Sequence, residues 1–468
     1  MNAPLLWIIL PGAATLILYA LRRWQAAVHL AALALALLLA LLAWRLPVGE
    51  PIELGLPGVA PLVVGDTLTV LGRRLVLENG MRPVLALLYL AVSLWLGGAY
   101  AAAAPRLFVP FSLAIAALVV ASLAVRPTLY AALFIQLAAL VAVPLLSPPG
   151  KPVRGGVLRF LIFQTVGMSF VLFADYLLNR LQSQPEMTEL VLPATLLFGL
   201  GFALTAAIFP FHTWVPMLAE ESHPYAAAFI FFFIPSAVAF IGLDYLRQYS
   251  TLSNFTAIQV LLRSAGALMC LVAGVWAAFE NRLERIMGFA ALVQVGMGLL
   301  AISLGSQAVP GAPLGGLFFA QLAAQCLGLA VWSQALAVMR RQVPDLRFRS
   351  ALGLAQRLPI ASMGLVLANF SLAGLPLLAS FPGSVALWSA LTGVSLPAAL
   401  LSLVGNACLF AAGMRTLAVL VTGFDAPAWS VAEEGWPATL LILGILLLLA
   451  IGMTPQWLMP ALTSLALP

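Results

Sequence analysis

Long apolar runs follow one another along almost the whole chain. Each holds roughly 20 residues, the length that an α-helix needs to cross the hydrocarbon core of a bilayer, and on this criterion the pattern predicts about 14 transmembrane helices. Their predicted extents are 4–21, 27–45, 83–103, 108–125, 127–147, 156–178, 191–209, 225–246, 257–279, 285–304, 314–339, 359–380, 394–421 and 437–458, with a short half-helix at 382–393. The runs are continuous rather than alternating, which excludes a transmembrane β-barrel.

One connection between these runs has a pattern of its own. Residues 46–82 contain the stretch VVGDTLTVLGRRLVLENG, in which apolar and polar positions alternate around turn residues. That alternation predicts a small surface hairpin.

Composition agrees with a membrane protein. Of the 468 residues, 63% are hydrophobic and 8% are charged, and mean hydropathy is +1.08. Soluble domains usually carry about 25% charged residues. A water-soluble fold of this size could not bury so much apolar surface, so the predicted fold class is all-α, a polytopic membrane protein.

The basic residues predict how the chain is oriented. Formal net charge is +6. The connections after odd-numbered helices hold Arg22, Arg23, Arg106, Lys151, Arg154, Arg159, Arg282, Arg285, Arg340, Arg341, Arg347, Arg349 and Arg357. Because basic loops stay in the cytoplasm, these connections are expected there and both termini on the outer side. No basic run is interleaved with aromatic residues, so nucleic-acid binding is not supported.

Two of the predicted helices are interrupted. The residues that break them are Pro210, Pro216, Gly374, Pro376 and Gly383. Proline removes a backbone donor, and irregular backbone inside a membrane is tolerated only where protein or water covers it. The alternative is a pair of ordinary proline kinks.

The two breaks lie five predicted helices apart, and a unit with an odd number of helices must invert in the membrane. Paired broken helices in corresponding positions are typical of inverted-repeat transporters. The pattern therefore divides the chain into helices 1–3 with the hairpin (1–105), a first inverted repeat (106–250), a second (251–422) and a last helix (423–468).

Three stretches resemble motifs of one membrane-protein family. Residues 208–224, IFPFHTWVPMLAEESHP, resemble the P-(F/L)-H-x-W-L-P-x-A-H-x-x-A-P signature of the antiporter-like subunits of respiratory complex I and of Mrp cation/proton antiporters. Residues 280–298, ENRLERIMGFAALVQVGMG, and 372–383, LAGLPLLASFPG, are similar to two further segments of that family. The resemblance covers about residues 60–425, in order and with the helix count of the family's shorter, fourteen-helix members.

This resemblance implies a non-catalytic subunit of a complex I-type NADH:quinone oxidoreductase in a bacterial inner membrane. The family role is proton translocation coupled to quinone reduction, beside other membrane-arm subunits and lipid. No phosphate-binding loop, cysteine cluster or paired histidine points to a cofactor or metal on this chain. A component of an Mrp-type antiporter or of an inorganic-carbon uptake transporter remains the alternative.

The resemblance also assigns positions along a proton path. In the family these positions carry mostly lysine, glutamate or histidine. Here the matching residues are Gln136, Thr205, His212, Gln321, Gln325 and Ser384. Apart from the histidine, these side chains are neutral at any physiological pH. They can hydrogen-bond water but cannot hold and release a proton, so the resemblance implies a weak or absent proton path in this subunit.

A few charged or titratable residues fall within or beside the apolar runs. Arg263 and Arg415 lie well inside them, and a charge there is expensive, so Arg415 is expected to need an acidic or carbonyl partner in this chain or a neighbouring subunit. His212 either gates a half-channel or satisfies carbonyls freed by the prolines.

The charged residues near helix ends have simpler expectations. Asp175 with Arg180, and Asp244 with Arg247, are expected as interfacial pairs on the outer side. Glu220, Glu221 and His223 follow the first break and are expected in a solvated loop.

Overall fold

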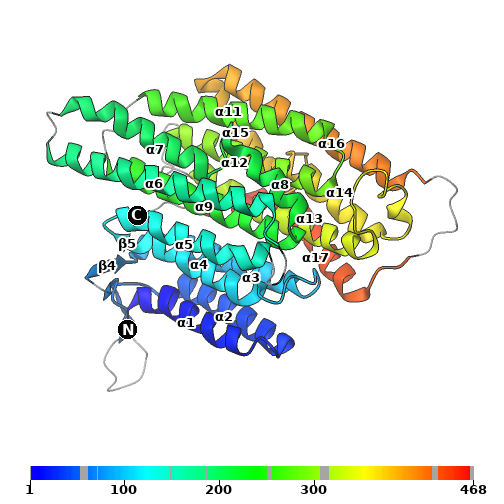
Figure 1. Cartoon of the computed structure of the whole chain (residues 1–468), viewed down its shortest axis with the longest axis horizontal. Helices are drawn as coiled ribbons and strands as arrows, with labels where there is room; N and C mark the ends of the chain where they lie inside the picture. Colours follow the sequence, from blue (N-terminus) through cyan, green and yellow to red (C-terminus); the bar gives the residue numbers. More distant parts are fainter. Residues whose placement is uncertain are drawn as a thin grey trace.

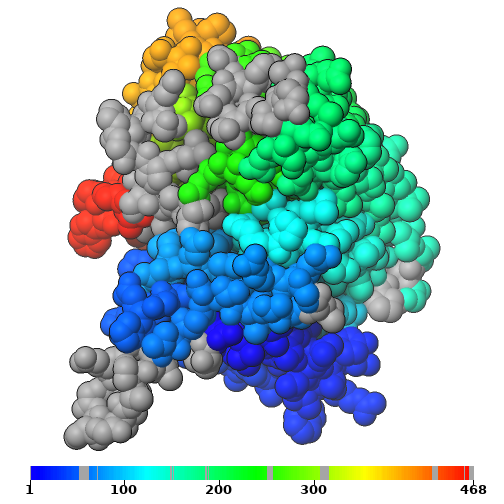
Figure 2. All heavy atoms as spheres, turned by 90° about the vertical axis from the view of Figure 1, so that its left-hand side faces the viewer, coloured from blue at the N-terminus to red at the C-terminus, as the bar shows by residue number. Residues whose placement is uncertain are grey.

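The structure is a computed structural model that describes residues 2–52, 62–70, 72–147, 150, 152–184, 187–249, 256–305, 316–423 and 431–463. Lys151 and part of the 46–82 connection lie outside the described residues. The helices run roughly parallel and side by side, with the N-terminal helices at one edge of the molecule and the helices around residues 256–279 and 396–421 at the opposite edge (Figure 1). In the view at right angles, the chain passes from blue through cyan to green across the surface in sequence order (Figure 2).

The N-terminal part holds three helices and the small strands. The helices are η1 with α1 (Leu5–Ile9 and Leu10–Ala20), α2 (Gln25–Arg45) and α3 (Arg82–Ala99), which follows the turn η2 (Asn79–Met81). Strands β3 (Thr67–Val70) and β4 (Arg73–Val76) pair antiparallel, which confirms the predicted hairpin. Three short strands were not predicted as part of a sheet: β5 (Val125–Arg126) extends the hairpin, and β1 (Pro51–Ile52) pairs with β2 (Leu62–Val63).

The remaining helices form two series and a C-terminal pair. The first series is α4 (Phe108–Ala124), α5 (Leu129–Leu146), α6 (Gly155–Ser183), η3 (Thr188–Leu190), α7 (Val191–Thr205), η4 (Phe211–Thr213), α8 (Trp214–Glu221) and α9 (Pro224–Gln248). The second is α11 (Thr256–Phe279), α12 (Leu283–Ser303), α13 (Gly316–Gln342), η6 (Leu354–Gln356), α14 (Pro359–Leu372), α15 (Phe381–Val394) and α16 (Leu396–Val421). The chain then continues through α17 (Gly435–Met453) and α18 (Pro455–Thr463).

These helices confirm the polytopic, all-α membrane class. Ten helices of the described chain are long and apolar enough to cross a membrane, and every other predicted span coincides with a shorter apolar helix. Helices α9, α12 and α13 are almost wholly buried, whereas less than half of α2, α6, α11 and α17 is buried, and each of these four exposes large apolar side chains. Such exposed leucine-rich faces are stable in contact with lipid.

The two series pack in the same order. In the first, α4 contacts α5, α5 contacts α6 and α6 contacts α7; in the second, α11, α12, α13 and α14 follow the same scheme. The last helix of each series, α9 or α16, packs back on the first, α4 or α11. This recurrence agrees with two repeats, and the four segment boundaries stay a prediction.

Helices α11 and α16 approach each other at a pair of glycines. A Cβ atom on Gly274 would overlap the carbonyl oxygen of Gly405, and a Cβ on Gly405 would overlap that of Cys270. Backbones can come this close only where neither residue has a side chain, a common arrangement between membrane helices.

We expect Gly274→Ala to destabilise the chain by about 1–3 kcal/mol or more, because the backbones must separate. The matched control is Gly12→Ala in α1, where nothing lies within 4 Å of the added methyl group. That control should be neutral or stabilising by about 0.5–1 kcal/mol. Unfolding of the full chain in detergent measures both, and equal stability of the two variants would contradict the close approach.

Candidate functional site

The first helix break begins at the end of α7, inside the predicted extent 191–209. The helix ends at Thr205, because Ala207 takes a left-handed conformation with φ of +59°. The N–H of Ile208 then donates to the carbonyl of Ala203 at 2.8 Å. This hydrogen bond, which spans five residues, is the signature of a Schellman cap. The 3₁₀ turn η4 and the short helix α8 continue the chain past the prolines.

The second break has the same backbone geometry. Helix α14 ends at Leu372, earlier than the predicted 380, and Gly374 is left-handed with φ of +79°. The N–H of Leu375 donates to the carbonyl of Phe370 at 3.0 Å. Both first halves therefore end in the same cap, once with alanine and once with glycine.

A buried glutamine amide closes each half-helix. Nε2 of Gln164, on α6, donates to the carbonyl of Thr205 at 2.9 Å, and Nε2 of Gln294, on α12, donates to the carbonyl of Leu372 at 2.7 Å. Both carbonyls belong to the last helical residue, at the end of a helix that carries partial negative charge. A neutral amide thus supplies the donor at both breaks. Sequence reasoning assigned no role to either glutamine, although Gln294 lies in a quoted motif.

Thr205 is enclosed and has its hydroxyl group occupied. Its side chain is fully buried, and Oγ1 donates to the carbonyl of Gly201, four residues earlier, at 2.9 Å. Its methyl group occupies the space that a Cβ on Gly167 of α6 would need. The position therefore has no room for a longer side chain.

The structure brings part of the predicted path together at the second break. Gln321 lies next to Gly383, since a Cβ added to this glycine would be 3.7 Å from Cδ of Gln321. Ser384 lies next to Gly374, since a Cβ added there would be 3.4 Å from Oγ of Ser384. Gln321 and Ser384 are buried, and Gln325 is buried one turn further along α13. Gln321 and Ser384 therefore place neutral polar side chains beside the break.

Two other predicted positions lie elsewhere. Gln136 on α5 is half-exposed and donates to Oγ1 of Thr165 on α6 at 2.8 Å. His212 is half-buried in η4, where its ring stacks on Phe209 with centroids 5.5 Å apart. The structure therefore does not gather the predicted positions into one continuous cluster.

Buried polar atoms accumulate at the second break. Five residues around this break are among the described residues with a buried side-chain atom that lacks a hydrogen-bond partner: Gln321, Asn369, Ser371, Ser380 and Trp388. Buried polar groups are nearly always satisfied by protein or by ordered water. We therefore expect water molecules between α13, α14 and α15 at this point.

The two arginines inside the apolar runs have different surroundings. Arg415 donates to the carbonyl of Ala278 and, at 2.9 Å, to Oδ1 of Asn281, so its partners lie in this chain at the end of α11. Arg263 is half-buried, and its Nε has no hydrogen-bond partner among the described residues.

The expected pairing of Asp175 with Arg180 is wrong. Asp175 is buried and accepts hydrogen bonds from the hydroxyl of Tyr245 and from Nδ2 of Asn179, both at 2.7 Å. Asp244 forms an ion pair with Arg126 at 2.9 Å, and the charge of the expected partner Arg247 also acts on it. Each acid thus has a partner distant in sequence, Tyr245 for Asp175 and Arg126 for Asp244, which helix-end spacing does not reveal.

The expected solvated loop after the first break is also wrong. Glu220 forms an ion pair with Arg282 at 2.8 Å. His223 is largely buried beside Arg340 and Arg341, and burial together with these two charges lowers its pKa to about 4. This histidine is therefore neutral at physiological pH.

The long apolar helices and the two matching breaks define a polytopic membrane protein with two interrupted helices. Residues 155–410 match the family model described as NADH:quinone oxidoreductase/Mrp antiporter, TM. The chain belongs to this family.

Curated relatives are similar over part of their length. NADH-quinone oxidoreductase subunit 13 of Thermus thermophilus is 28% identical over 322 residues, covering 65% of this chain and 66% of the relative. NADH-quinone oxidoreductase subunit N 2 of Solidesulfovibrio magneticus is 30% identical over 195 residues, covering 42% and 40%. The chain thus aligns with less than two thirds of either relative.

Solved structures share the whole fold. A chain of the archaeal membrane-bound sulfane sulfur reductase matches with a TM-score of 0.80 and 18% identity, covering 99% of this chain and 97% of that one. A chain of the Mrp complex from Dietzia sp. DQ12-45-1b gives 0.80 and 17%, covering 99% and 96%. One of Thermus thermophilus respiratory complex I gives 0.79 and 21%, covering 99% and 98%. All three belong to membrane complexes, and at these identities the likeness is one of fold.

We expect Gln294→Leu to lower the free energy of unfolding by about 1–3 kcal/mol, because the carbonyl of Leu372 loses its donor inside the bundle. Gln342→Leu, at the exposed end of α13, is the matched control and should stay within about 0.5 kcal/mol of the parent. Thermal unfolding in detergent measures both. If Gln294→Leu is as stable as the control, the amide does not hold the break.

Proposed function

We propose that this chain is a membrane-arm subunit of a complex I-type NADH:quinone oxidoreductase in a bacterial inner membrane. The names of the curated relatives favour this assignment over an Mrp-type antiporter or an inorganic-carbon transporter. In this proposal the chain lies beside other membrane-arm subunits and binds no cofactor, and electron transfer takes place elsewhere in the complex.

We further propose that the subunit's own proton path is weak or lost. The observation that carries this is the pair of neutral amide caps at the breaks, together with the buried, hydrogen-bonded Thr205. A proton relay needs groups that change protonation state in the working pH range. Threonine, serine and glutamine side chains do not.

The hydrogen bonds at the ends of α7 and α14 support this proposal. The terminal carbonyls of both helices carry partial negative charge, which a cationic side chain or a neutral donor can balance. The glutamine amides do so without a mobile proton. The subunit would then keep the bent scaffold of the family as a structural part of the membrane arm.

Water at the second break does not by itself make a pump. The side chains there can hold water through Gln321, Ser384 and their neighbours. Without a titratable group, the free energy of a proton at that point cannot be switched by a change in side-chain charge. The proposal therefore assigns this water a structural role.

The test begins with membranes that contain the tagged full chain. Purification in mild detergent should bring down quinone-reductase subunits with iron–sulfur clusters, and a preparation without redox centres would contradict the complex I assignment. The purified complex is then reconstituted in liposomes, and protons pumped per NADH oxidised are compared for the parent and Thr205→Val. Valine has nearly the shape of threonine, so packing is retained.

We expect the same proton-to-NADH ratio for both, because the hydroxyl group of Thr205 serves only its own helix. Ser384→Ala is the matched variant at the second break and should also leave the ratio unchanged. A lower ratio at unchanged NADH oxidation, in either variant, would show that the neutral side chains take part in a working path.

A further inference from the structure

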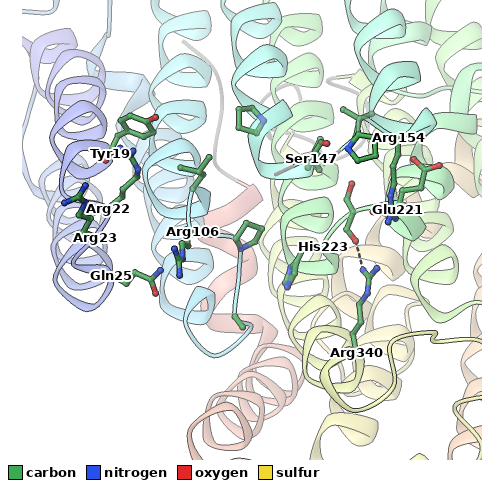
Figure 3. Close-up of a pocket in the computed structure, with 18 residues that line it drawn as sticks. Tyr19, Arg22, Arg23, Gln25, Arg106, Ser147, Arg154, Glu221, His223 and Arg340 are labelled. Atoms are coloured by element: carbon green, nitrogen blue, oxygen red, sulfur yellow. Dashed lines mark hydrogen bonds between the residues drawn. The ribbon is translucent and has the colours of Figure 1, made fainter. Parts of the chain in front are cut away.

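Five arginines line a cavity at one end of the helices. The cavity has a volume of about 1200 Å³. Its arginines come from four parts of the chain, and Figure 3 shows them around the same space: Arg22, Arg23, Arg106, Arg154 and Arg340. A second cavity of about 440 Å³ shares Arg22 and Arg106 with the first.

These guanidinium groups are not neutralised by acidic partners. Within the part of the chain that the structure describes, none of the five forms an ion pair with a carboxylate. By contrast, Arg282 and Arg285 pair with Glu220, and Arg347 pairs with Asp345. The positive charge of the cavity arginines is therefore not balanced by carboxylates, in contrast to that of Arg282, Arg285 and Arg347.

Backbone carbonyls hold several of these side chains in place. Arg154 donates to the carbonyl of Glu221 at 2.9 Å, Arg340 to that of Ser222 at 2.7 Å, and Arg22 to that of Tyr19 at 3.1 Å. Each bond uses one of the five donors of a guanidinium group, so others remain for a ligand.

The acidic residue among the described lining residues, Glu221, does not cancel this charge. Its carboxylate accepts a hydrogen bond from the backbone N–H of Gly156 at 2.7 Å. One carboxylate stands against five guanidinium groups. The low pKa of His223 on the same wall, caused partly by Arg340, fits a positive potential here.

Apolar side chains continue from the cavity onto the membrane-facing surface. Leu107, Leu146 and Val157 line it beside the arginines. In the first turns of α6 beyond Arg154, Leu158 and Ile162 are exposed. A ligand bound here would contact positive charge at the helix ends and apolar surface along the helices. A lipid has matching parts, because its anionic headgroup suits the first and its acyl chains suit the second.

We propose that this cavity binds the phosphate group of an anionic phospholipid, with its acyl chains along the apolar surface of α6. Guanidinium groups bind phosphate oxygens through paired hydrogen bonds. Basic pockets between transmembrane helices are suited to anionic headgroups. The bound lipid would link the ends of α1, α4, α6 and α13, because the arginines lie in the last turns of α13 or in the connections next to the other three helices.

The test uses the full chain in mixed micelles with equal amounts of phosphatidylglycerol and phosphatidylcholine. Lipid retained per chain is counted by native mass spectrometry. The parent should retain phosphatidylglycerol in preference to phosphatidylcholine. Each arginine near an anionic headgroup contributes about a fivefold gain in binding, so Arg22→Gln/Arg106→Gln should weaken phosphatidylglycerol binding about 25-fold.

The matched control is Arg349→Gln/Arg357→Gln, which removes the same charge from exposed positions between α13 and α14. It should retain the lipid as the parent does. If the double cavity variant does not purify, Arg106→Gln alone, with an expected fivefold loss, replaces it.

Three outcomes would overturn the proposal. Equal retention of the two lipids by the parent would show that no anionic headgroup is selected. If the cavity variant retains as much phosphatidylglycerol as the parent, or if the control loses as much as the cavity variant, the cavity is not the site that selects the lipid. Displacement of the lipid by millimolar inorganic phosphate would show that the cavity is a site for soluble phosphate.

Discussion

This structure depends on one interaction. At each interrupted helix, a buried glutamine amide donates a hydrogen bond to the last carbonyl of the first half. A helix that ends inside a bilayer exposes carbonyl groups that lipid cannot satisfy. Gln164 and Gln294 supply the missing donors at equivalent points of the two breaks. The bends can therefore persist in the middle of the molecule without a buried charge.

The surrounding architecture follows from these two bends. Helices α9, α12 and α13 form the buried centre, and the breaks contact that centre through α8 and α15. A close approach of Gly266 to Gly296 brings the outer helix α11 onto α12, and the approach of Gly274 to Gly405 joins α11 to α16. At the second break, the unsatisfied amide and hydroxyl groups create a neutral polar interior that water would complete.

The sequence predicts the helices well, because a continuous apolar run of about 20 residues that crosses a membrane must satisfy its backbone hydrogen bonds within a helix. The hairpin at residues 67–76 was equally accessible from its alternation and turn residues. The positions of the breaks were predictable from Pro210 and Gly374, but the helix ends were not. Each helix end depends on a residue in the left-handed conformation before the next proline. These residues are Ala207 at the first break and Gly374 at the second.

Features made by distant residues escaped prediction. Gln164 and Gln294 resemble any isolated glutamine until the structure shows which carbonyl each meets. Asp175 was expected at the interface and instead binds Tyr245, 70 residues away. The arginine cavity was visible only as scattered loop charges, because its members come from helix ends that meet in space.

A measurement of proton flux decides whether the two amide-capped breaks conduct protons. The full chain is reconstituted alone in liposomes, a potassium diffusion potential is imposed, and internal pH is followed with a trapped dye. If the breaks conduct no protons, the flux equals that of protein-free liposomes. A faster flux that Gln321→Leu abolishes would contradict the proposed loss of the proton path.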